Sequence, residues 1–341
     1  MKRLAFFLST FFFSALSAHA QDMFTVDFKH FKKVHVVKFD KPDTLIIATI
    51  DQIDVDSADR LLITDRIGER VLLFDSTGTL EASLNPSVCH PGFTFSPRGA
   101  RFVGSDFILV LNNMSGQWGY RFTNEGSCMG NTDRNFSGAQ FFDTGPDGIL
   151  YGMVFWPDRK LKRMSSIGKT LEEIKLPPTK FPNSEDRFSN GGLIADGENI
   201  FYTSAGEPGI LKYQIDGTFI KKIYKHNSWF NFPKKDLPSD VNRLSKALKD
   251  YQGKTGQFSL FELTEEAIMI QYIGGDRGEG FAGYQVFTKD GELVVEDFGL
   301  KSLFIHGENG FVYRVVQPGL DGRGELPNPF VEVYQFIVSL R

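Results

Sequence analysis

The sequence predicts an all-β protein, a six-bladed β-propeller that is closed by an N-terminal strand and carries one helical insertion between blades 4 and 5. Two recurring turns and one unpaired strand-like segment near the start of the chain lead to this prediction. A lone four-stranded unit cannot cover its own apolar faces, so we expect the repeated units to stack around an axis and close into a ring.

The more regular turn, here called the anchor turn, is an apolar residue followed four positions later by glycine. Its copies are FDSTG (74–78), FTNEG (122–126), MSSIG (164–168), YQIDG (213–217) and FTKDG (287–291). The first four anchor glycines lie about 42 to 49 residues apart, a spacing typical of propeller blades. Short alternating apolar runs flank the turns, which predicts β-hairpins.

A second turn recurs earlier in each unit and leads into an apolar strand. Its copies are DSADRLLITD from 56, GSDFILVL from 104, GPDGILYGMVF from 145, ADGENIFYTS from 195, LTEEAIMIQY from 263 and HGENGFVYRVV from 306. Each unit therefore contains strand, polar turn, strand, loop, strand, glycine turn and strand, which is one four-stranded blade.

The sixth unit lacks the anchor glycine and ends after residues 331–338, one strand short of a blade. Residues 33–39 (KVHVVKF) have no blade of their own, so we expect them to pair outside residues 331–338. Such pairing removes exposed strand edges. The alternative is a disordered N-terminal extension and an open last blade.

The segment DVDSADRLLITDRIGERVLLFDSTGTL at 54–80 resembles an NHL-type repeat, and the later units match more loosely. As an architecture, nearly the whole mature chain is similar to the NHL-repeat and TolB-like six-bladed propellers of exported bacterial proteins. Propellers of this kind include scaffolds, binding proteins and several enzymes, so the resemblance implies a fold and does not imply one activity.

Residues 1–20 have the pattern of a secretory signal peptide. Lys2 and Arg3 precede an apolar run over 4–16, and Ala18-His19-Ala20 ends the segment with small residues. We expect cleavage after Ala20 and a single propeller domain over 21–341, in the periplasm or outside the cell. A membrane anchor is the alternative, but the run is shorter than the ~20 apolar residues that cross a bilayer.

The charge of the chain disfavours polyanionic partners. The formal net charge is -4, and it becomes -6 when Lys2 and Arg3 are removed (-4 minus 2). This balance gives no basic surface for nucleic acid or an anionic membrane. We therefore expect a monomer with no transmembrane anchor and no nucleic-acid partner.

Cys89 and Cys128 are the two cysteines of the sequence. In an oxidising compartment such a pair predicts a disulfide. Two unpaired thiols, packed as small hydrophobic side chains, are the alternative.

Function is expected at one end of the ring, because the loops between second and third strands emerge on the same end as the connections between blades. The long segments lie there, and long loops are often functional. The longest is the insertion at about 226–257, in which Ser239 and the spacing of Val241, Leu244 and Leu248 predict an amphipathic helix. This helix either packs on the propeller or binds a partner.

Arginine, carboxylate, amide and tryptophan side chains on this end are candidates for ligand binding, because bidentate Arg groups and stacked aromatic rings are common recognition elements. The candidates are Arg66, Asn112, Trp118, Trp156, Arg159, Glu207, Trp229, Asp276 and Arg277. Our first hypothesis is an exported, non-catalytic propeller that binds a protein, peptide or glycan there and needs no cofactor.

The second hypothesis is a divalent-metal-dependent lactonase or hydrolase of the senescence-marker and gluconolactonase type. That resemblance implies Ca²⁺ or another divalent cation on the axis, held by carboxylate and amide oxygens. The candidate ligands are Asp65, Asn112 and Asp276. The sequence has no HExxH or GxSxG motif, and GGDRGEG at 274–280 lacks the GK[ST] ending of a phosphate-binding loop.

Overall fold

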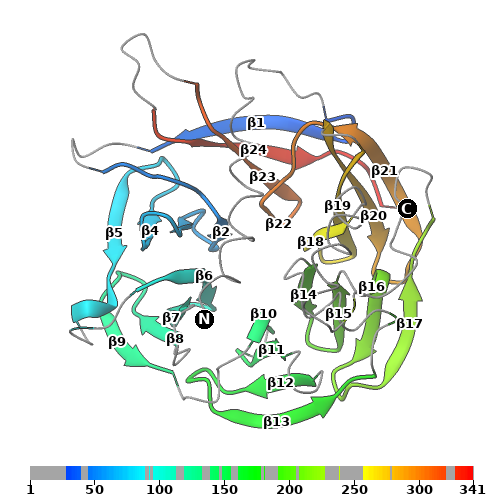
Figure 1. Ribbon diagram of the computed structural model, residues 1–341, viewed down its shortest axis with the longest axis horizontal. Helices are drawn as coiled ribbons and strands as arrows, with labels where there is room; N and C mark the ends of the chain where they lie inside the picture. Colours follow the sequence, from blue (N-terminus) through cyan, green and yellow to red (C-terminus); the bar gives the residue numbers. More distant parts are fainter. Residues whose placement is uncertain are drawn as a thin grey trace.

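A computed structural model describes residues 28–39, 45–88, 92, 95–112, 119–132, 139–145, 148–154, 160–177, 180, 191–204, 207–226, 238, 256–276, 279–319 and 327–340. These residues form 24 strands in six four-stranded antiparallel sheets arranged around a central axis (Figure 1). The chain is therefore a six-bladed β-propeller, as the repeats predict. Within the described ranges, the helical content is a single 3-10 turn, Pro86–Val88.

Each blade contains four strands in sequence order, with the first strand nearest the axis (Figure 1). Blade 1 contains β2 (Gln52–Val55), β3 (Leu61–Asp65), β4 (Arg70–Phe74) and β5 (Leu80–Leu84). Blade 2 contains β6 (Pro97–Val103), β7 (Phe107–Asn112), β8 (Gly119–Phe122) and β9 (Cys128–Asn131). Blade 3 contains β10 (Ala139–Thr144), β11 (Leu150–Val154), β12 (Lys160–Met164) and β13 (Thr170–Lys175).

The remaining blades follow the same order except at the ring closure. Blade 4 contains β14 (Gly191–Ala195), β15 (Asn199–Ser204), β16 (Glu207–Gln214) and β17 (Phe219–Ile223). Blade 5 contains β18 (Gly256–Thr264), β19 (Ala267–Asp276), β20 (Glu279–Thr288) and β21 (Leu293–Leu300). Blade 6 contains β22 (His306–Glu308), β23 (Phe311–Val316), β24 (Phe330–Phe336) and, as its outermost strand, β1 (Phe31–Lys38).

Blade 6 joins the two ends of the described chain. In Figure 1, β1 (blue) lies alongside β24 (red), and their antiparallel register places Phe31 opposite Phe336 and Lys38 opposite Phe330. A charged group reinforces the pair, because the buried Glu332 carboxylate on β24 lies 3.1 Å from Lys33 Nζ on β1 and 2.7 Å from Arg314 Nη1 on β23. These two segments are the ones that the sequence predicts to pair.

The anchor glycines mark the contacts between blades. Four of them lie against the outermost strand of the preceding blade: Gly78 against β1, Gly126 against β5, Gly217 against β13 and Gly291 against β17. A Cβ on Gly78 would collide with the carbonyl oxygen of Lys38, and its φ of 94° is also unfavourable for an L side chain. The glycine repeats because each of these turns must leave room for its neighbouring blade.

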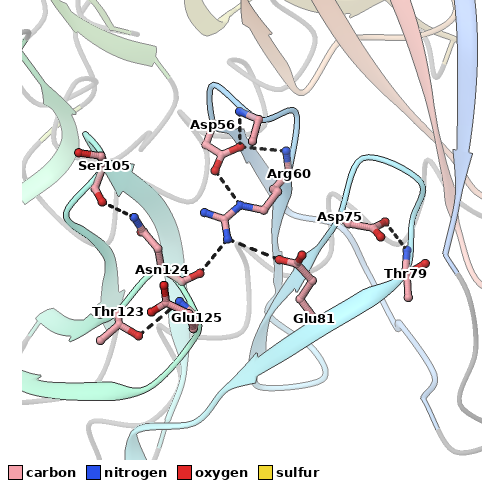
Figure 2. Close-up of polar contacts among 10 residues, drawn as sticks. Asp56, Arg60, Asp75, Thr79, Glu81, Ser105, Thr123, Asn124 and Glu125 are labelled. Atoms are coloured by element: carbon pink, nitrogen blue, oxygen red, sulfur yellow. Dashed lines mark hydrogen bonds and ion pairs between the residues drawn. The ribbon is translucent and has the colours of Figure 1, made fainter.

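Polar side chains hold the turns and connect blade 1 to blade 2 (Figure 2). The Asp56 carboxylate accepts hydrogen bonds from the backbone N–H of Ala58 (3.0 Å) and Arg60 (2.9 Å). The Arg60 guanidinium donates to Asp56 (2.8 Å) and reaches the carbonyl oxygen of Asn124 in the next blade (2.9 Å). Asp and Thr at the start of a turn satisfy its backbone donors in this way.

Blade 5 contains two buried glutamines where aliphatic residues would ordinarily pack. Gln271, 1% exposed, donates to the carbonyl oxygen of Phe304 (2.7 Å) and accepts from its N–H (2.8 Å). Gln285, fully buried, donates to the carbonyl oxygen of Lys225 (3.2 Å) and accepts from the Tyr272 hydroxyl (2.9 Å). The two side chains thus hold the connections that enter and leave this blade.

Several predicted features lie outside the described residues. They are the signal peptide at 1–20, Cys89, and the helical part of the insertion at 226–257, although β18 already begins at Gly256. Cys128 is disulfide-bonded, but its pairing with Cys89 stays a prediction. The described part of the chain contains no helix that is long and apolar enough to cross a membrane.

Substitution of an anchor glycine tests the contact between blades. We expect Gly78→Ala to lower the free energy of unfolding by about 3 kcal/mol, because the added methyl group displaces β1 from the turn and the backbone stays at positive φ. Gly104→Ala is the matched control, since Gly104 has a φ of 54° and open space around its Cβ position. The control substitution is expected to lower the free energy of unfolding by about 1 kcal/mol. Equal losses in denaturant titrations would show that β1 does not press on the turn.

The buried glutamine in blade 5 allows a second test of the fold. We expect Gln271→Leu to lower the free energy of unfolding by about 3 kcal/mol, because both backbone polar groups of Phe304 lose their partner in a buried site. The control is Gln335→Leu on β24, an exposed position where a change within about 0.5 kcal/mol is expected. A Gln271→Leu protein as stable as this control would contradict the assigned role.

Candidate functional site

The two ends of the ring differ in the length of their connections. At one end, here called the turn end, the first and second strands and the third and fourth strands of each blade are joined by short turns such as 56–60, 75–79 and 104–106. At the other, the loop end, lie the strand ends that border the longer intervals of the chain, 85–96, 176–190, 224–255 and 317–329. The strand order thus agrees with the predicted difference between the two ends, and ligand binding at the loop end stays a prediction.

At the loop end of blade 1, the buried Asp65 carboxylate organises two segments. Its oxygens accept hydrogen bonds from the backbone N–H of Ala48 (3.1 Å), Thr49 (3.2 Å) and Gly68 (2.8 Å), and Arg70 Nε lies 3.3 Å away. The Thr49 hydroxyl donates a further, longer hydrogen bond to the same carboxylate (3.4 Å). Both oxygens of Asp65 are thus surrounded by groups of the protein. Asp65, a metal-ligand candidate from the sequence, thus binds groups of the protein itself.

Two exposed isoleucines lie on the backbone segments that Asp65 and Arg70 bind. Ile46 precedes the bound segment at 48–49 and Ile67 lies within the β3–β4 loop, with 67% and 70% of their surfaces exposed. Arg70 connects both segments, because its Nη2 donates to the carbonyl oxygen of Ile46 at 2.7 Å while Nε faces Asp65. They are the two most exposed large apolar side chains that the structure describes. The loop end of blade 1 thus presents apolar side chains on anchored backbone.

Two other ligand candidates lie beside this region. Arg66 is half-buried. Burial of Arg98, at the start of blade 2, is the main cause that lowers the pKa of this arginine, and the positive charge of Arg66 lowers it further. Asn112 ends β7, and its side-chain oxygen accepts a hydrogen bond from the N–H of Ser96 at 2.7 Å. The structure therefore brings Arg66 close to a second arginine and gives Asn112 a role in holding the connection between blades 1 and 2.

The remaining candidates stay predictions. Trp118, Trp156, Arg159, Trp229 and Arg277 lie outside the described residues. Glu207 begins β16 and Asp276 ends β19, but only their backbone positions are described.

A charged group on the innermost strands, which the candidates from the sequence do not include, lies toward the turn end of the axis. Arg101 on β6 has its Nη1 3.1 Å from Asp143 on β10 and 3.6 Å from Asp54 on β2. Each carboxylate also reaches the following blade: Asp54 accepts from the N–H of Phe102 (2.7 Å) and Asp143 from that of Ala195 (2.9 Å). Polar contacts on the axis thus connect blades 1 to 4.

Residues of blades 4, 5 and 6 continue this set, with Asp196 directly after β14 and Lys289 in the turn between β20 and β21. Lys289 Nζ lies 2.6 Å from Glu262 and 3.4 Å from Asp196, and His306 Nε2 lies 3.3 Å from Glu308. We call the whole set the axial belt: Asp54, Arg101, Asp143, Asp196, Glu262, Lys289, His306 and Glu308. A charged residue recurs one to three positions before the second turn in several units, and this recurrence is the sequence signal for the belt.

Burial perturbs the carboxyl groups of the belt. It raises the pKa of Asp54 to about 6, with a smaller contribution from Glu308, while Arg101, His306 and the Phe102 N–H act in the opposite direction. Burial also raises the pKa of Asp143 and of Glu262, against the attraction of Arg101 and Lys289 respectively. Burial in the belt therefore favours the neutral form of these carboxyl groups, against the attraction of the neighbouring cations.

The residues in the described ranges do not provide the cluster of metal ligands that the metal-dependent hypothesis needs. Within those ranges, no group of three or more His, Cys, Asp or Glu side chains is arranged to hold a metal ion. Of the predicted trio, Asp65 and Asn112 accept hydrogen bonds from backbone N–H groups, and the side chain of Asp276 lies outside the described residues, so the trio stays a prediction.

The role of Asp65 can be tested by hydrogen exchange. We expect Asp65→Ala to lower the free energy of unfolding by about 3 kcal/mol or more, because buried donors and Arg70 lose their acceptor. The amides of Ala48, Thr49 and Gly68 are then expected to exchange faster than in the wild type. Glu69→Gln, on the exposed side of the same loop, is the control and should leave both measurements unchanged. Unaltered exchange in Asp65→Ala would contradict the assignment.

Comparison with known proteins identifies the fold and no family. No family model matches the chain, and no curated protein matches its sequence. Among solved structures, a protein of Bacteroides fragilis predicted to be exported is 14% identical, with a TM-score of 0.58 over 89% of this chain and 95% of its own. A member of the duf4221 family from Bacteroides vulgatus is 9% identical, with a TM-score of 0.63 over 89% and 97%.

A streptogramin B lyase structure is also similar, at 17% identity and a TM-score of 0.43 over 78% of this chain and 65% of its own. Similarity at that level says nothing about the activity of this chain. The two higher-scoring structures support the architecture seen in Figure 1, a six-bladed β-propeller.

Proposed function

We propose that this protein is an exported, non-catalytic propeller that binds a protein or peptide ligand at its loop end. The observation that carries the proposal is the pair of exposed isoleucines, Ile46 and Ile67, on backbone that Asp65 anchors. Binding sites need such preorganisation, because ordering a mobile loop on binding costs free energy.

Exposure of these side chains is costly unless a ligand covers them. Fully burying an isoleucine contributes about 1.5–3 kcal/mol, so covering both supplies enough free energy to dominate a small interface. Single exposed apolar residues are common on protein surfaces, but these two lie on neighbouring segments joined through Arg70. Their position favours a ligand.

Of the ligand classes expected from the sequence, aliphatic side chains favour a protein or peptide over a glycan. Isoleucine packs against other apolar side chains, whereas sugars require hydrogen-bonding groups and flat aromatic faces. Arg66 and Arg70 flank Ile67 and supply the polar rim that such interfaces have around their apolar centre.

Two observations support export. Residues 1–20 have the charge and hydropathy pattern of a signal peptide. The similar Bacteroides fragilis protein is itself predicted to be exported. We place the protein in the periplasm or outside the cell on these grounds.

Site-specific photo-crosslinking in the cells that produce the protein tests this proposal. A photoreactive amino acid at position 46 or 67 is expected to give a covalent adduct with a protein or peptide. The matched control carries the same amino acid at Thr77, an exposed position in a turn at the opposite end of the ring. No adduct is expected there.

A second variant separates specific capture from chance contact. Ile67→Ser, combined with the photoreactive group at position 46, should reduce the adduct by about tenfold, because losing one buried isoleucine weakens binding by at least about 1.4 kcal/mol. Adducts from position 77 alone, equal adducts from both ends, or no adduct at all would refute loop-end binding.

A further inference from the structure

Among the described residues, the axial belt has five carboxyl groups but only two side chains with a permanent positive charge, Arg101 and Lys289. Arg101 is shared by Asp143 and Asp54, and Lys289 is shared by Glu262 and Asp196. Glu308 has its ion-pair contact with His306. Carboxylates that share too little positive charge in a site of low polarity do not all ionise together, and one of them keeps its proton.

Asp54 is the carboxyl group best placed to keep that proton. It is 5% exposed, its Oδ1 lies farther from the Arg101 guanidinium than Asp143 does, and its Oδ2 is occupied by the N–H of Phe102. Of the charged groups that act on it, Arg101 on β6 and His306 on β22 favour ionisation, whereas Glu308 on β22 opposes it.

The place of Asp54 in the ring decides which contact its proton affects. β2 carries Asp54 in the first blade and β22 carries Glu308 in the last blade, and these two inner strands are neighbours where the last blade meets the first. The negative charge of Glu308 acts on Asp54 across this junction. We propose that Asp54 is a proton-binding site at this junction, and that loss of its proton weakens the contact between the first and last blades.

The direction of the effect follows from linkage. The pKa of Asp54 is raised to about 6, chiefly by burial, so the folded protein binds more protons than the unfolded chain between this value and the ordinary aspartate range. The stabilisation by the proton is fully present below the unfolded pKa and is lost as the pH rises through about 6. The contact between blades 1 and 6 is thus strongest in mild acid.

Other groups act in the opposite direction over part of this range. Burial lowers the pKa of His30, so that group disfavours the folded state in acid, and Asp75 and Glu332 have pKa values below their usual range. The melting temperature of the wild type alone therefore does not isolate Asp54. A difference between wild type and variant does.

The experiment measures melting temperature from about pH 8 to about pH 5 for the wild type and Asp54→Asn. The variant carries a permanently neutral side chain of the same shape, so we expect it to melt higher than the wild type at the alkaline end. This gap should close toward the acidic end, with its midpoint near pH 6. Asp216→Asn, in an exposed turn of blade 4, is the control and should give a gap that does not vary over this range.

A second variant keeps the proposal testable if Asp54→Asn does not fold. Glu308→Gln removes the neighbouring negative charge, so it should melt higher than the wild type at alkaline pH and match it in acid. A gap that is constant with pH in both variants would refute the proposal. Stabilisation of the wild type, but not of Asp54→Asn, by millimolar calcium chloride at alkaline pH would also refute it, because a bound cation would then balance the belt.

Discussion

Each blade of this propeller depends on its neighbours to cover the two apolar faces of its sheet. The core accordingly consists of clusters shared between adjacent blades, such as the one in which Leu62 and Leu73 of blade 1 pack with Ile108 and Phe122 of blade 2. A ring satisfies this requirement for every blade only if its last sheet is complete. The pairing of β1 with β24 therefore matters to the stability of all six blades, and the charged contacts of Glu332 lie at that joint.

The fold is predictable because its determinants are local and repeated. An anchor glycine such as Gly126 is required by its own turn, with a φ of 89°, and by the Ala82 side chain of the preceding blade, 2.6 Å from where a Cβ would lie. Both constraints recur in other blades, so they leave a periodic trace in the sequence. The missing strand of the sixth unit can likewise be recognised from the sequence, because that unit has one strand-like segment fewer than a complete blade.

The candidate site is less predictable because its contacts join residues that follow no common period. Asp65 and Asn112 have the chemistry of metal ligands, and only the structure shows that backbone N–H groups occupy their oxygens. Asp54, Arg101 and Asp143 come from three blades, and their convergence depends on which way each side chain leaves its inner strand. A charge near a turn is ordinarily solvated, so the sequence alone does not distinguish the belt from surface residues.

The belt and the exposed isoleucines are separated by a single short strand. β2 runs from Gln52 to Val55, a rise of about 10 Å at the usual 3.3 Å per residue. Asp54 lies toward one end of it, and at the other end the Asp51 carboxylate accepts hydrogen bonds from Arg66 N–H (3.0 Å) and Thr49 Oγ1 (2.6 Å). Thr49 and Gly68 are in turn held by Asp65. The backbone that presents Ile46 and Ile67 is therefore tied by hydrogen bonds to the residue that directly precedes the strand carrying Asp54.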